Sequence, residues 1–136
     1  MKIKTLLLAT TLTLFTLASI GQNKATLYKA DQWLDTKAKG GWAKAYKDPT
    51  KEKAEVLLTI KSIKVTLGAK IYDYKLISFY RFSPVQWRYV VTLNGKTYEI
   101  VISQHSLEID NETYSIGIEG EWMLASITDV SVVDIK

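Results

Sequence analysis

The chain has 136 residues, with no cysteine, four tryptophans, eight tyrosines and a formal net charge of +4 at pH 7. A single domain of this size can bury about two thirds of its unfolded surface, so it can be stable without covalent cross-links. The lack of cysteine excludes disulfides, a thiol nucleophile and a cysteine-ligated zinc site, and stability must therefore come from packing.

Residues 1–21 have the pattern of an export signal. Lys2 and Lys4 lead an apolar run, and small residues occupy the −3 and −1 positions before the predicted cleavage point after Gly21. No second long apolar run follows that would span a membrane. We therefore expect residues 22–136 to form a single all-β domain that works in the periplasm or outside the cell.

Residues 24–53 carry mixed signals. Ala25–Ala30 fits a strand, Gly40-Gly41 interrupts any helix through the surrounding tryptophans, and Asp48-Pro49-Thr50 is typical of a turn. We expect two strands in this segment rather than a helix.

From about residue 54 onward, apolar and polar residues alternate as they do in strands. Asn94-Gly95 is the strongest hairpin signal, because a type I′ turn needs positive φ at both central residues. Short strands joined mostly by tight turns predict an antiparallel meander that closes as a small barrel or folds over as a β-sandwich. The predicted strands are Val56–Ile60, Ile63–Leu67, Ile71–Phe82, Trp87–Leu93, Tyr98–Ile102, Tyr114–Ile118 and Trp122–Ile127.

Charge is divided between the two halves of the chain. Residues 24–70 hold eleven lysines and five acids, whereas residues 96–136 hold two lysines and eight acids. One interpretation is that the two halves lie side by side and offset each other. The other is that the N-terminal lysines form a basic face for an anionic glycan or an envelope surface. Nucleic acid is not an expected partner of an exported protein.

Aromatic residues supply the stronger functional signal. A period of two puts three tyrosines of strand 71–82 on one face, opposite aromatic residues of the next two strands. Five hydroxyls in an interior need partners or water, which suggests a space for a small apolar or amphipathic ligand. If the hydroxyls instead reach the rim of the barrel, or if the face that carries them is partly the outer face of the sheet, this row of aromatic side chains is a candidate carbohydrate or protein surface. The candidate ligand-binding residues are Tyr72, Tyr74, Tyr80, Trp87, Tyr89 and Tyr98.

Catalytic chemistry has little support. His105 is the sole histidine, and Ser103 and Ser106 are too close to it along an extended strand to point toward it. Neither serine sits in a nucleophile elbow. We expect no metal, no cofactor and no enzymatic activity. A cluster of carboxylates fits a solvated edge rather than a calcium loop; it comprises Glu108, Asp110, Glu112, Glu119 and Glu121.

Gly40-Gly41-Trp42 has the Gly-x-Trp form with which lipocalins open their first strand, and Gly120-Glu121-Trp122 has the same form. With a meander of about eight strands after it, the chain resembles small exported lipocalin-like β-barrel proteins of Gram-negative bacteria. The lipocalin pattern also has an arginine on the last strand, whereas the arginines here are Arg81 and Arg88. The resemblance implies a barrel that binds a small ligand. The alternative function is an envelope-associated interaction protein that uses the basic N-terminal face.

Overall fold

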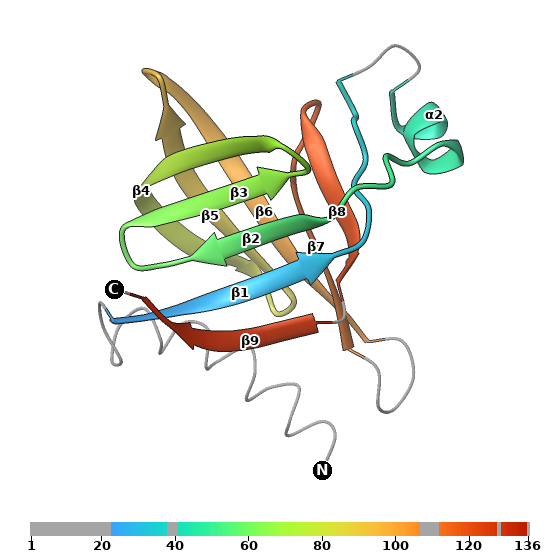
Figure 1. The fold of residues 1–136 in the computed structure, drawn as a ribbon. Helices are drawn as coiled ribbons and strands as arrows, with labels where there is room; N and C mark the ends of the chain where they lie inside the picture. Colours follow the sequence, from blue (N-terminus) through green and yellow to red (C-terminus); the bar gives the residue numbers. More distant parts are fainter. Residues whose placement is uncertain (1–22, 38–40, 107–111, 128, 136) are drawn as a thin grey trace.

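The computed structural model describes residues 23–37, 41–106, 112–127 and 129–135 (Figure 1). Their strands form a nine-stranded antiparallel sheet in the order β8-β7-β6-β5-β4-β3-β2-β1-β9. The predicted all-β meander is confirmed, and the predicted export signal lies outside the described residues. The elements are β1 (Lys24–Ala30), α2 (Gly41–Lys47), β2 (Ala54–Leu58), β3 (Ser62–Leu67), β4 (Lys70–Ser83), β5 (Gln86–Leu93), β6 (Lys96–Ser106), β7 (Glu112–Ile118), β8 (Trp122–Ile127) and β9 (Asp129–Asp134).

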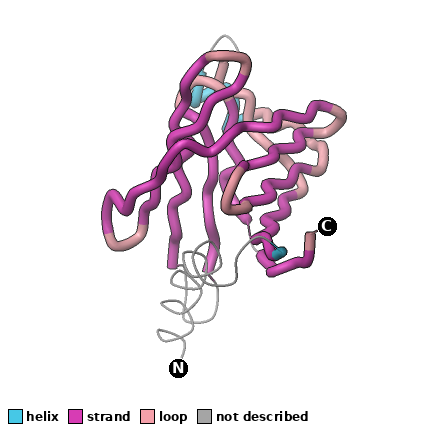
Figure 2. Tube along the Cα trace, turned by 90° about the vertical axis from the view of Figure 1, so that its left-hand side faces the viewer, coloured by secondary structure: helices cyan, strands magenta, loops and turns pink. Residues whose placement is uncertain are grey.

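The sheet curls into a barrel-like shape rather than folding over as a sandwich (Figures 1 and 2). Leu34, just beyond β1, exchanges two backbone hydrogen bonds with Met123 of β8, with N···O distances of 2.7 and 2.9 Å. β9 follows β8 and pairs with β1 over six residue pairs. The first and last parts of the described chain are therefore joined, which brings the two ends of the meander together.

Alternation along the strands fills the interior with apolar side chains. In β2 and β3 the residues Val56, Leu58, Ile63 and Val65 are completely buried, while Glu55 and Lys64, which alternate with buried residues, are exposed. Branched aliphatic residues suit this arrangement because they pack well on a pleated surface with one buried face. The core is therefore continuous around the inside of the sheet.

The segment between β1 and β2 differs from the prediction. β1 matches the expected first strand, but α2 is a helix where a second strand was expected. Gly41 begins the helix rather than interrupting it, and the residues after it include Ala43, Lys44 and Ala45, which favour helix. Ala45 is buried, so tertiary packing supports the helix as well. The expectation of two strands in this segment is wrong.

A β-bulge at Ile77 changes which residues of β4 face inward. The register with β5 shifts by one residue there, so that Phe79 lies opposite Tyr89 and Tyr80 lies opposite Arg88. An extra residue on one strand reverses the alternation beyond it. The prediction that Tyr80 points into the interior is therefore wrong, and the residue is 45% exposed.

The oppositely charged halves of the chain do lie side by side. Lys24 of β1 forms an ion pair with Asp134 of β9, and Lys29 lies opposite Asp129 in the same pair of strands. Along β1 and β9, charges from the N-terminal and C-terminal parts of the chain are therefore neighbours. Among the described helices, none has the length and apolar character needed to cross a bilayer.

Candidate ligand-binding pocket at one end of the barrel

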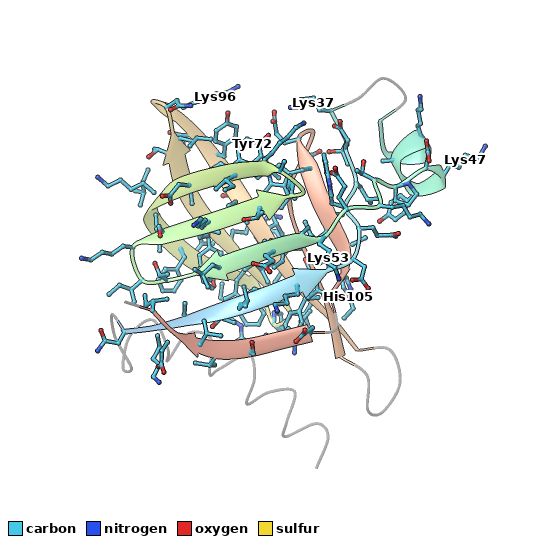
Figure 3. All side chains as sticks on the ribbon, in the orientation of Figure 1. Lys37, Lys47, Lys53, Tyr72, Lys96 and His105 are labelled. Carbon is cyan, nitrogen blue, oxygen red and sulfur yellow. The ribbon has the colours of Figure 1, made fainter. Side chains whose placement is uncertain are left out.

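Four chain segments meet at one end of the barrel: the stretch after β1 and the turns that join β3 to β4, β5 to β6 and β7 to β8. Alternate connections of a meander share an end, which is why these segments converge. They enclose a pocket of about 260 Å³, and Figure 3 shows Tyr72, Lys37 and Lys96 at this end. The pocket is lined by Trp33, Asp35, Lys37, Leu67, Lys70, Tyr72, Tyr74, Leu93, Asn94, Tyr98, Glu121 and Trp122.

Three tyrosines and Trp122 form a connected aromatic wall. The rings of Tyr74 and Tyr98 meet edge to face, with centroids 5.8 Å apart and planes at 80°, and the Tyr72 and Tyr74 centroids are 6.1 Å apart. Trp122 Nε1 donates a hydrogen bond of 3.1 Å to the Tyr74 hydroxyl. Tyr74 and Trp122 are buried, whereas Tyr72 and Tyr98 are half-buried. The first two therefore anchor the wall, and the other two keep part of their surface open.

Trp33 supplies the ring on the side of β1 and is held from several directions. Its backbone exchanges hydrogen bonds of 3.0 and 2.8 Å with Thr50, and its Nε1 donates to Glu52 Oε1 at 3.1 Å. The ammonium of Lys70 lies 5.8 Å from the ring centroid, within the range of a cation–π contact. Trp33 is thus fixed in place by these contacts.

Both signs of charge border the pocket. Asp35 and Glu121 supply carboxylates, and Lys37 and Lys70 supply ammonium groups. Asp35 Oδ1 accepts a hydrogen bond of 3.1 Å from the backbone N–H of Lys37, which fixes the local turn. At the rim, the ammonium of Lys96 lies 5.4 Å from the Tyr98 ring centroid. The site therefore combines aromatic faces with both cationic and anionic groups.

The Tyr74 hydroxyl is a hydrogen-bonding group and not a base. Burial raises the pKa of Tyr74 to about 12, and the hydrogen bond from Trp122 only partly opposes this. The neighbouring hydroxyls of Tyr72 and Tyr98 and the carboxylate of Glu121 contribute smaller increases to this pKa. At neutral pH the phenol is therefore protonated.

The structure brings together three of the six candidate residues, Tyr72, Tyr74 and Tyr98. Trp87 and Tyr89 are buried in the core and do not line this pocket. Tyr89 stacks on Phe79 with centroids 5.5 Å apart, and burial, followed by the proximity of Tyr28, raises the pKa of Tyr89.

Tyr80 lies apart from these residues, on the outer face of the sheet. Its hydroxyl donates a hydrogen bond of 2.8 Å to Glu99 Oε2. The outward orientation that the sequence left open as an alternative therefore holds for Tyr80, while the other five candidate residues are buried or half-buried.

Several lining residues were missed from the sequence, above all Trp33, Trp122, Lys70 and Glu121. A signal for them does exist, because residues next to alternate turns of a meander must share one end of it. Applied to the turns at Gly68, Asn94-Gly95 and Glu119-Gly120, this rule selects the residues beside them. The positions of the turns, rather than the aromatic pattern alone, carry the information about the pocket.

His105 and the serines do not assemble as a catalytic group at the pocket. His105 is exposed near the end of β6, with its Nε2 3.0 Å from Ser115 Oγ, and Ser103 Oγ accepts a hydrogen bond from Gln86. The side chain of Ser106 lies outside the described residues, as do those of Glu108, Asp110 and Glu112. Within the described part of the chain, no three His, Cys, Asp or Glu side chains are grouped to hold a metal ion.

No protein-family model, curated protein or solved structure matches this chain.

Proposed function

We propose that this protein is an exported binding protein that holds a small amphipathic molecule in the pocket at the end of the barrel. The supporting observation is that five aromatic residues and four charged residues from four separate segments converge on one pocket of about 260 Å³. Small-molecule sites are usually concave and rich in aromatic residues, with a few fixed polar groups. The volume lies just below the range of about 300–1,000 Å³ that is typical of such sites. It suits a molecule built on a single ring.

The mixture of groups favours an amphipathic ligand over a purely apolar one. Aromatic faces attract apolar groups and cations, while the ammonium groups of Lys37 and Lys70 and the carboxylates of Asp35 and Glu121 would lose water when the site fills. Burying charges without compensating contacts is costly. A ligand that carries a charged group next to its ring would provide those contacts.

Four probes that share one phenyl ring would test the proposal. They are 2-phenylethanol, phenylacetate, phenylethylamine and phenylalanine, which are neutral, anionic, cationic and zwitterionic. Binding to residues 22–136 would be followed by tryptophan fluorescence and calorimetry. We expect at least one charged probe to bind more tightly than the alcohol, because only a charged probe can compensate the groups at the rim.

Substitutions of two tyrosines would place the site. We expect Tyr98→Ala to lower the affinity for the tightest-binding probe by about tenfold, because the Tyr98 ring supplies open aromatic surface to the pocket. Tyr80→Ala is the matched control, since it removes the same ring from the outer face. Native mass spectrometry of protein purified from its own envelope fraction would add a direct readout of any co-purified ligand. Absence of both probe binding and extra mass would overturn the proposal, and so would equal weakening by the two substitutions.

The alternative function, an envelope-associated interaction protein, is supported by exposed lysines near α2. Lys44 and Lys47 are exposed at the end of this helix, and Figure 3 shows Lys37, Lys47 and Lys53 on the side of the molecule that carries α2. Retention on heparin as a function of salt tests this alternative. Elution below physiological salt would contradict it, since a polyanion site must hold against screening at that ionic strength.

A further inference from the structure

The hairpin formed by β4 and β5 carries an exposed apolar surface at the end of the barrel opposite the pocket. Every residue of β4 from Ile77 to Phe82 is exposed, so both faces of this part of the strand lack a cover among the described residues. The exposed fractions are 57% for Ile77, 57% for Phe82 and 50% for Val85. A sheet normally buries one face, so several large apolar side chains exposed within one hairpin are a candidate site of interaction.

The side chains of this hairpin surface are held in fixed positions. Phe79 stacks on buried Tyr89, with a ring-centroid distance of 5.5 Å. On the outer face, the guanidinium of Arg88 lies 3.9 Å from the Phe82 ring centroid, and Tyr80 is hydrogen-bonded to Glu99. The hairpin therefore presents an ordered apolar surface.

The two arginines of the chain, Arg81 and Arg88, both belong to this hairpin. Arg88 is paired with Glu99 at 3.2 Å. Arg81 instead donates hydrogen bonds to the backbone carbonyls of Ser83 and Pro84, at 3.3 and 3.0 Å, and forms no ion pair with the described residues. The Arg81 guanidinium also lies 5.4 Å from the centroid of the buried Trp87 ring. The tip thus carries a cation without a carboxylate partner among the described residues, in the same segment as exposed Phe82 and Val85. Arginine is the side chain best suited to bind phosphate groups.

We propose that the β4–β5 hairpin docks on an anionic lipid bilayer, with Phe82 and Val85 at the boundary between headgroups and acyl chains and Arg81 among the lipid phosphates. A hairpin with exposed apolar side chains on both faces fits a fluid environment that surrounds it, whereas a protein partner would cover one face. A two-fold contact with its axis at the hairpin tip would bring Arg81 toward Arg81, which like charge opposes. Apolar insertion combined with attraction of arginine to anionic lipid is a recognised mode of reversible membrane binding.

Co-sedimentation with vesicles tests this proposal. Residues 22–136 would be mixed with vesicles of phosphatidylcholine alone or of phosphatidylcholine with phosphatidylglycerol. This form of the chain contains the whole described core, which runs from Ala25 to Ile127, and omits the apolar N-terminal segment that would itself bind lipid. We expect binding to the anionic vesicles, with about tenfold loss for Phe82→Ser together with Val85→Ser and about fivefold loss for Arg81→Gln.

Ile71→Ser is the matched control for these variants. Ile71 is 61% exposed on the same strand but lies near the opposite end of β4. We expect this variant to bind vesicles as the parent does, and circular dichroism would verify that every variant is folded. Failure of the parent to bind, equal binding to both vesicle types, or equal loss with Ile71→Ser would overturn the proposal. A parent that is dimeric in sedimentation and becomes monomeric with Phe82→Ser, without binding vesicles, would instead assign the surface to self-association.

Discussion

At the scale of single residues, the Tyr74 hydroxyl connects the pocket to the core. It accepts the hydrogen bond of the buried Trp122 indole, so Tyr74→Phe leaves that N–H without its acceptor. We expect the free energy of unfolding to fall by about 1–3 kcal/mol, the usual cost of an unsatisfied buried polar group. Urea unfolding followed by circular dichroism measures it. Tyr72→Phe is the control, with an expected change within about 0.5 kcal/mol; equal effects would contradict the prediction.

Alkaline pH is a second test of buried tyrosine. The folded-state pKa of Tyr74 is raised to about 12 from an ordinary value of 10.0, and that of Tyr89 is also raised. Because the folded state binds these protons more tightly, their contribution to stability is complete below pH 10.0 and is lost as the pH rises through the folded-state pKa. We expect the urea midpoint to fall between about pH 10 and about pH 12, and less steeply in Tyr74→Phe. Unchanged midpoints over this range would contradict the assignment.

At the scale of secondary-structure elements, two glycines test two different causes of destabilisation. A Cβ on Gly117 of β7 would lie 2.6 Å from the carbonyl oxygen of Trp122 and 3.0 Å from Met123 Cα. Gly117→Ala must therefore push β8 away, and we expect it to cost about 1–3 kcal/mol and to weaken ligand binding through Trp122. Gly95 has a φ of +80°, and a Cβ there would meet no atom within 4 Å, so Gly95→Ala should cost only about 1–2 kcal/mol in backbone strain.

The two glycine variants are separated by comparing stability with binding. Both are expected to lower the urea midpoint, but Gly117→Ala should also reduce affinity for the phenyl probes, because it displaces a residue of the aromatic wall. The prediction fails if Gly117→Ala leaves both the midpoint and the affinity unchanged.

Asn94 and Gly95 have φ angles of 53° and 80°, so the hairpin turn predicted from these two residues is confirmed.

The bulge in β4 shows why elements that are correctly located can still be misoriented. Between Ile77 and Phe82 both faces of the strand carry large apolar residues, so the sequence pattern does not distinguish the inner face from the outer one. The error with Tyr80 arises there. Tyr72 and Tyr74 lie before the bulge, where polar residues alternate clearly with apolar ones, and their predicted face is correct.

At the scale of the whole molecule, β9 joins the end of the described chain to its beginning. Its pairing with β1 connects residues as far apart as Lys24 and Asp134, which are 110 positions apart in sequence. Deleting residues 129–136 would leave β1 with an unpaired edge. We expect a large drop in the urea midpoint and stronger light scattering. Lys24→Ala removes only the exposed ion pair and should cost less than about 1 kcal/mol; a truncated chain as stable as this variant would contradict the role of β9.

The sequence by itself determined the all-β class, the strands between residues 54 and 127, the Asn94-Gly95 turn and three aromatic residues of the pocket. These follow from local causes, because the period of two and the turn residues act between near neighbours in the chain. Tertiary structure alone decided that α2 is a helix and which side chains of β4 face inward beyond Ile77. It also decided the pairing of β9 with β1 and the meeting of Trp33 with Trp122 at one pocket. These depend on contacts between segments far apart in sequence, which local patterns do not encode.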